Sequence, residues 1–161
     1  DTGDRVVFGR GDVQAPIGVA IRASSSIPGF FQPVEHGGRR YVVGGVHSPT
    51  NADLLADAGC DIVVIVSPMS ATRLAHGALL PTARPLHARR LAHEVEQIRR
   101  AGTQVLTFQP MPGDVAAMGR NPMDARRRPA TTEAALASAR TRLADPELAE
   151  RLALLRAASS S

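Results

Sequence analysis

The sequence predicts an α/β fold in which a mostly parallel sheet is layered against flanking helices. The uninterrupted β-branched run at 61–66 (DIVVIV) is typical of a strand buried on both faces, as in a parallel sheet. A helical apolar stripe follows at 86–101, and 103–108 (TQVLTF) has the pattern of another strand. Strand, helix and strand in this order indicate a layered α/β domain.

The first third of the chain contains shorter elements. Residues 4–9 and 17–21 are predicted to be extended, and 22–31 is a small-residue stretch that closes on a Pro-Gly turn. A strand is predicted at 40–43, where Gly44-Gly45 stops it. A helix is then expected over 49–59, ending at the glycine that commonly follows a helix.

Helices dominate the prediction for the remainder of the chain. In 86–101, Leu91, Val95 and Ile98 form one apolar stripe, and Glu96 is spaced to pair with Arg100. After the second strand, 113–130 is predicted to be a loop with about one turn of helix. The pattern is helical from 131 onward, and Asp145-Pro146 is predicted to interrupt this helix and start the last one.

Composition limits the classes of protein to consider. The chain has 161 residues, of which 43% are hydrophobic and 21% charged, which favours one globular domain over disorder. No apolar run is as long as the ~18 residues that a membrane span needs. Cys60 is the single cysteine, so an internal disulfide and a cysteine-based zinc site are both excluded.

All 19 basic residues are arginines, and they give a net charge of +4 against 15 acids. A basic balance is compatible with nucleic acid or an anionic membrane as partner. Aromatic residues make up only 3% of the chain, so stacking platforms for single strands are nearly absent. We therefore rank nucleic-acid binding as a distant alternative to a solvated basic surface.

Several motifs in the first 70 residues occur in a recognisable order. Residues 23–34 read A-S-S-S-I-P-G-F-F-Q-P-V, 41–45 read Y-V-V-G-G, and 59–66 place a strand after G-C-D. This series resembles the patatin-like phospholipase family. The resemblance is strong over 1–70 and looser to about 130, so we expect 1–130 to be the C-terminal part of a patatin-like phospholipase domain and 131–161 to be a C-terminal helical segment.

The resemblance implies a partial, layered patatin-like fold and the chemistry of a serine acyl hydrolase. In that family a serine in a G-x-S-x-G elbow attacks a lipid ester, and the aspartate of a D-G-G motif is its base. An upstream glycine-rich loop stabilises the oxyanion. Such a hydroxyl needs both a base and fixed N–H donors to react.

This chain departs from the family pattern at both catalytic positions. No G-x-S-x-G occurs in it, and we expect the nucleophile to lie upstream of Asp1. The D-G-G position reads Val43-Gly44-Gly45, and valine has no proton acceptor. The chain is therefore predicted to be inactive, with no intact catalytic residue. The resemblance also implies candidate pocket residues, namely Ser24, Ser25, Ser26, Pro28, Gly29 and His47.

Other reactive residues give weaker signals. His47, Ser48 and Asp53 contain triad residue types but lie outside an elbow motif. His87 and His93 are six residues apart and do not share a helix face, so we predict no metal site, and no cofactor is implied. Cys60 is interpreted as a small core residue. The Arg126-Arg127-Arg128 run is interpreted as a solvated loop, with contact to anionic lipid headgroups as the alternative.

Three hypotheses therefore stay open. The first is the C-terminal part of a patatin-like lipid hydrolase, the second a catalytically dead homologue that binds lipid or a partner, and the third a nucleic-acid-binding domain. The expected partners are a lipid or other acyl ester in the complete domain, and the missing N-terminal half of that domain. Because neither a signal segment nor a transmembrane segment is recognised, we expect a cytoplasmic protein, with peripheral membrane contact as an option.

Overall fold

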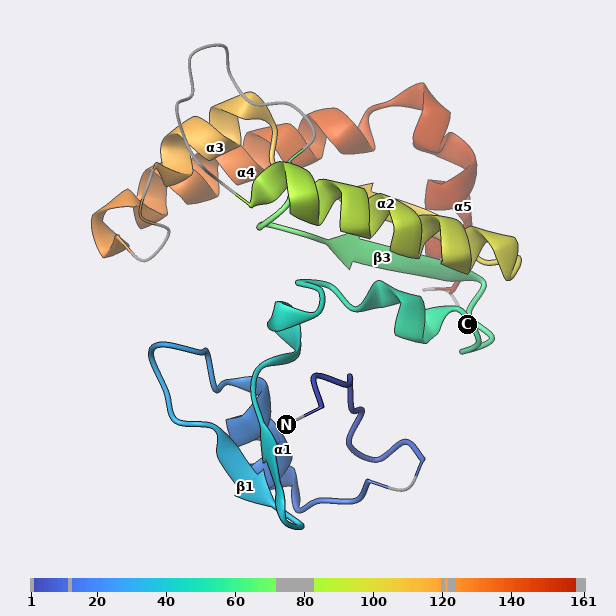
Figure 1. The fold of residues 1–161 in the computed structure, drawn as a ribbon. Helices are drawn as coiled ribbons and strands as arrows, with labels where there is room; N and C mark the ends of the chain where they lie inside the picture. The colour runs from blue at the N-terminus through green and yellow to red at the C-terminus, as the bar shows by residue number, and fades with distance from the viewer. Residues whose placement is uncertain (1, 12, 72–82, 120, 122–123, 159–161) are drawn as a thin grey trace. The chain divides into compact units, whose positions relative to one another are not determined.

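The structure is a computed structural model, and it divides the chain into two compact units, Asp1–Asn51 and Ala52–Ser161. Each unit is described by itself below, and Figure 1 shows the course of the chain through both. The residues that the structure describes are 2–11, 13–71, 83–119, 121 and 124–158.

The first unit begins with a helix where an extended segment was predicted. Residues 17–21 lie in α1 (Ile17–Ser24), so the extended prediction is wrong. Pro16 precedes the helix, and its carbonyl accepts hydrogen bonds from the N–H groups of Val19 (2.9 Å) and Ala20 (3.1 Å). A short apolar run does not distinguish helix from strand by periodicity, and the fixed φ of proline suits a helix start.

A two-stranded antiparallel hairpin follows, made of β1 (Val34–His36) and β2 (Arg39–Tyr41). Gly37 and Gly38 form its turn with φ values of 56° and 72°, which glycine adopts without strain and which match a type I′ hairpin turn. The strand predicted at 40–43 is confirmed in position, although it ends two residues earlier than expected. The 3₁₀ helix η1 (Gly44–Val46) comes next.

The second unit contains the predicted strand–helix–strand series. β3 (Ile62–Val66) and β4 (Gln104–Phe108) pair in parallel, in a register that places Val64 opposite Leu106. Helix α2 (Arg84–Arg100) connects them and runs alongside β3 (Figure 1). These elements confirm the α/β class, but each sheet in the described residues has two strands, so the sheet is smaller than predicted.

The main core lies between this parallel pair and α2. Leu91, Val95 and Ile98 are buried, as the predicted stripe required. The expectation that 61–66 is buried on both faces is wrong, because Val64 and Val66 are 44% and 68% exposed. The remaining members of the core cluster are Ala52, Val63, Ile65 and Val105. Successive side chains of a strand point to opposite faces of the sheet, so Val64 and Val66 lie on the face of β3 away from the core cluster, whereas in β4 both Val105 and Leu106 are buried.

The segment before β3 is less helical than predicted. In place of a helix over 49–59, the structure has one 3₁₀ turn, η2 (Ala52–Leu55). Asn51 takes a φ of 47°, which is outside the helical region, and Gly59 ends the segment with a φ of 68°. The N–H of Ala52 donates to Oε2 of the buried Glu94 (3.1 Å), which joins this turn to α2.

The C-terminal part is helical, as expected, but it begins earlier. Part of the loop predicted at 113–130 is helix α3 (Pro112–Met118), so that prediction is wrong in its first third. The Asp114 carboxylate accepts from the Met111 N–H (2.7 Å), and Pro112 suits the first turn. The later elements are η3 (Ala125–Arg127), α4 (Arg128–Leu143), η4 (Pro146–Leu148) and α5 (Ala149–Ala158).

The predicted interruption at Asp145 is confirmed, since its Oδ1 accepts from the N–H of Glu147 (3.0 Å) where η4 begins. The predicted ion pair between Glu96 and Arg100 is also present, with Nε and Oε1 3.0 Å apart. The proposed division of the chain at residue 130 stays a prediction.

Candidate functional site

Val43, at the position expected for the catalytic acid, lies at the start of a tight turn. It directly precedes η1, and its carbonyl accepts from the N–H of Val46 (3.2 Å). Its own N–H donates to the carbonyl of Ser26 (3.0 Å). The backbone therefore presents the residue-43 side chain immediately before a one-turn helix, and that side chain is half-buried and purely apolar.

The two glycines after Val43 have room for a Cβ atom. Neither adopts a positive φ. A Cβ added to Gly44 would lie 3.5 Å from the side-chain amide of Asn51, which donates to the Gly44 carbonyl (3.2 Å) and to the Ser48 carbonyl (2.5 Å). A Cβ on Gly45 would lie 3.6 Å from the Val43 side chain. These are ordinary contact distances, so the turn itself does not strictly require glycine.

Among the candidate pocket residues, Ser26 is the one that the structure links to Val43. Ser26 is 5% exposed, and its hydroxyl donates to the Arg22 carbonyl (2.8 Å) near the end of α1. The Ser26 carbonyl accepts from the Val43 N–H, so Ser26 contacts both α1 and the turn at Val43–Gly45. The other candidates in this segment are exposed: Ser24, Ser25, Pro28 and Gly29.

Ser48 is held in a geometry that does not suit a nucleophile. It is fully buried, and its Oγ accepts hydrogen bonds from the N–H groups of Thr50 (3.3 Å) and Asn51 (3.2 Å). Such a hydroxyl caps a local turn. His47 is exposed beside it, and its N–H donates to Gly44 O (2.9 Å), while Asp53 belongs to the other compact unit. The role of His47 as a pocket residue stays a prediction.

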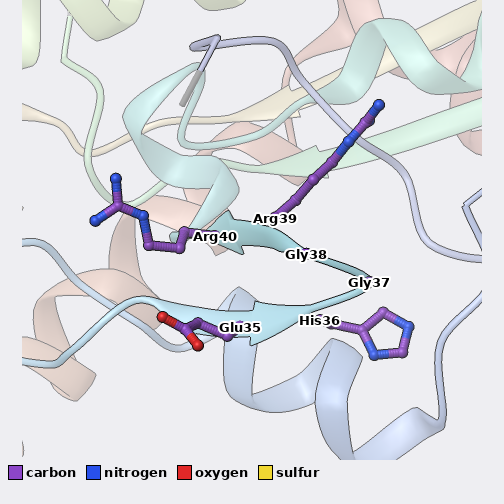
Figure 2. Close-up of a pocket in the computed structure, with 6 residues that line it drawn as sticks. All are labelled: Glu35, His36, Gly37, Gly38, Arg39 and Arg40. Carbon is purple, nitrogen blue, oxygen red and sulfur yellow. The ribbon is translucent and has the colours of Figure 1, made fainter.

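The β1–β2 hairpin borders a cavity of about 370 Å³ that the sequence analysis did not identify. Figure 2 shows its charged side chains spreading in different directions instead of converging on one point. His36 Nε2 lies 3.0 Å from the carbonyl of Gln14, and Glu35 is opposite Arg40 in the strand register. The lining residues are Glu35, His36, Gly37, Gly38, Arg39 and Arg40. An open site without apolar lining or convergent polar groups lacks the usual form of a small-molecule pocket.

The arginine run at 126–128 is partly helical. Arg126 Nε donates to Asp124 Oδ1 (3.1 Å), and Arg127 Nη1 donates to the Ala117 carbonyl (3.3 Å). Arg128 begins α4. The expected loop is therefore a short 3₁₀ helix that leads into α4, and two of its three cations contact groups of the same chain.

The remaining reactive residues are separated. Cys60 is a half-buried free thiol that packs beside the main core. His87 Nδ1 is 3.1 Å from the carbonyl of Met69, and His93 is exposed on α2. Across the residues that the structure describes, no three His, Cys, Asp or Glu side chains form a group able to hold a metal ion.

Three buried charged residues among those that the structure describes were missed by the sequence analysis, namely Arg84, Glu94 and Asp114. Arg84 and Glu94 are 7% and 2% exposed, at the start and in the middle of α2. A signal for Glu94 was available, since it falls on the stripe formed by Leu91, Val95 and Ile98. No periodicity marks Arg84, whose burial depends on contacts with segments far away in the sequence.

Residues 2–56 match the family model of the patatin-like phospholipases. This segment, which we call patatin-like because it is similar to that family, contains the Ser26–Val43 backbone link and the glycines of the turn after Val43. Residues 57–161 lie outside the match. No solved structure matches the chain.

None of the helices that the structure describes is both long enough and apolar enough to cross a membrane.

Proposed function

We propose that the patatin-like segment derives from a serine lipid acyl hydrolase and that this chain has no hydrolase activity of its own. The observation that carries this proposal is Val43, at the position where the family's motif has its acid. The half-buried side chain there offers only methyl groups. A serine hydroxyl activated by this position would have no group to take its proton.

The expected size of the defect follows from general acid–base chemistry. Loss of a positioned base costs on the order of 10² to 10⁴ in rate. The 161 residues also contain no G-x-S-x-G, and the best-placed serine near the motif, Ser48, is buried and caps a turn. With neither an activated nucleophile nor its base, the proposed activity of this chain is binding without turnover.

We further propose that a polypeptide carrying the N-terminal half of a patatin-like domain is the natural partner of residues 1–51. Exposed apolar side chains of this unit support the proposal, because large apolar side chains gathered on one unit are typical of interaction surfaces. Phe30 is 82% exposed and Phe31 62%. The others are Ile17, Ile21, Ile27, Val42 and Val46. The acyl-ester substrate and any peripheral membrane contact would belong to that completed domain.

A hydrolase assay with an active-site probe tests the proposal. The purified chain is incubated with a short-chain p-nitrophenyl ester, a phospholipid and a fluorophosphonate probe. We expect no ester hydrolysis above buffer and no covalent labelling, because no activated serine is present.

The Val43→Asp variant restores the family's acid, and Ser48→Ala removes the serine nearest to Val43 in the sequence. Val43→Asp is expected to stay inactive alone, since the nucleophile is still missing. Turnover by the unmodified chain that is lost in Ser48→Ala would contradict the proposal and make Ser48 the nucleophile.

A further inference from the structure

A buried arginine lies at the carboxyl end of the parallel strand pair, outside the patatin-like segment. Arg84 is the first residue of α2 and is 7% exposed. Its Nη1 donates to the carbonyl of Pro68 (2.6 Å), two residues after the end of β3. Its Nη2 lies 3.4 Å from Sδ of Met118, the last residue of α3. The guanidinium is thus enclosed where segments following β3 and β4 meet.

The two groups that the Arg84 guanidinium contacts among the described residues do not balance its charge. A carbonyl and a thioether are neutral, and they occupy two of the five N–H donors of an arginine. Within the part of the chain that the structure describes, no carboxylate forms an ion pair with Arg84. Burial lowers the pKa of Arg84 from its usual value, which reflects the cost of keeping the cation away from water. Buried charges are ordinarily paired with an opposite charge.

Two buried serine hydroxyls lie in the same segment. Ser67 and Ser70 are 2% and 0% exposed, and the Ser67 N–H donates to the carbonyl of Phe108 (2.9 Å), which fixes the segment to the end of β4. The Ser70 hydroxyl lies 2.9 Å from Ser67 Oγ and 3.1 Å from the Ser67 carbonyl. When Ser70 donates to Ser67, the Ser67 hydroxyl proton is left for another acceptor, and none is present among the described residues.

The start of α2 adds a third favourable contribution. Its N-cap residue, Ala83, has no side chain able to bond the first N–H groups of the helix, and because Pro85 has no N–H, Arg84 and Leu86 supply these groups. These groups carry partial positive charge and commonly bind anions. In open α/β sheets, ligands bind outside the carboxyl ends of the strands, which is where Arg84, Ser67 and Ser70 lie.

We propose that Arg84, together with Ser67 and Ser70, forms a binding site for a phosphate group at the carboxyl end of β3. A tetrahedral phosphate offers several acceptor oxygens, so it suits a set of donors that contains both a guanidinium and hydroxyls. The ligand is inorganic phosphate or a phosphate monoester, including the headgroup of phosphatidic acid. This inference concerns Ser67, Ser70 and Arg84 and does not depend on the proposed loss of hydrolase activity.

The test uses the full 161-residue chain and sodium phosphate, with sodium chloride at equal ionic strength as the reference. The ¹⁵N–¹H correlation spectrum follows the Arg84 Nε–H and the amides of Ser67 and Ser70. We expect saturable shifts of these signals with phosphate and none with chloride. In Arg84→Gln, phosphate affinity should fall by about tenfold or more, because the charge-assisted hydrogen bonds are lost.

Arg100→Gln is the matched control, because it removes an arginine of the same helix whose side chain is 74% exposed. Its phosphate affinity should equal that of the unmodified chain. If Arg84→Gln does not fold, Ser67→Ala provides the second variant, with a smaller loss of affinity expected. The chain is also titrated with glycerol phosphate and with monomeric short-chain phosphatidic acid. The compound that binds with the highest affinity shows whether the phosphate group comes from a soluble monoester or from a lipid headgroup.

Two results would overturn the proposal. One is the absence of saturable phosphate shifts in the unmodified chain. The other is equal phosphate affinity in the unmodified chain and the folded Arg84 or Ser67 variant. Either result would leave Arg84 as a purely structural residue that joins Pro68 to the end of α3. A structural role alone predicts lower stability of Arg84→Gln without any dependence on phosphate.

Discussion

The two compact units place their apolar side chains in opposite ways. In Ala52–Ser161, a core cluster between α2 and the parallel strands includes Leu91, Ile98 and Val105, each no more than 1% exposed. In the described part of Asp1–Asn51, Ala23 and Val34 are the buried apolar side chains, whereas Phe30 and Ile17 are 82% and 79% exposed. The second unit therefore has a core cluster, whereas the described part of the first unit leaves most of its large apolar side chains exposed.

The part of the chain that is similar to a known family is therefore not the part that contains the core. The patatin-like motifs occupy 2–56, almost entirely within the unit that lacks a core. The unit with the core lies almost entirely outside the match. Since buried apolar area is the main source of folding free energy, we expect the stability of this chain to come from residues 52–161.

The largest effect is expected in amide hydrogen exchange. Amides of α2, β3 and β4 should exchange on the order of 10³-fold more slowly than those of α1 and the β1–β2 hairpin, because core amides open only in near-global unfolding. Exchange mass spectrometry of the purified chain measures the difference. Similar protection in both units would mean that residues 1–51 are stabilised in a way that their burial does not explain.

A paired truncation should give the next largest effect. Leu91→Ala removes a side chain that is 1% exposed and should lower the free energy of unfolding by about 2–5 kcal/mol. Ile21→Ala, in α1, removes a side chain that is 60% exposed and should change it by no more than about 0.5 kcal/mol. Urea unfolding followed by circular dichroism measures both variants. If both variants lowered the free energy of unfolding by the same amount, the stability would not come mainly from the core of residues 52–161.

The smallest effect is expected in self-association. Replacing Phe30 and Phe31 with serine removes two of the most exposed apolar side chains and should weaken self-association severalfold, since burial of such side chains drives association. Light scattering over a concentration series measures it. Replacing Leu143, which is 46% exposed at the end of α4, is the matched control. If the unmodified chain is monomeric at all concentrations, this result would argue against the proposal that a partner binds the exposed apolar side chains of residues 1–51.

Strong periodicity made the elements of the second unit predictable. The run at 61–66 and the stripe of Leu91, Val95 and Ile98 identified β3 and α2 correctly, because burial against one partner leaves its period in the sequence. The segments 17–21 and 113–130 were misassigned. Each of these helices begins at a local contact: the Pro16 carbonyl accepts from Val19 and Ala20 at the start of α1, and the Asp114 carboxylate accepts from Met111 at the start of α3. Such a contact leaves no periodic pattern in a short segment.

The sequence by itself determined what this chain lacks for hydrolysis. The absence of G-x-S-x-G and the valine at position 43 are visible in the residue order, because catalysis requires particular functional groups. The tertiary structure alone decided that the Ser26 carbonyl holds Val43 and that Arg84 is buried beside Pro68 and Met118. These contacts join residues 16 to 34 positions apart, and only folding determines which distant groups share an environment.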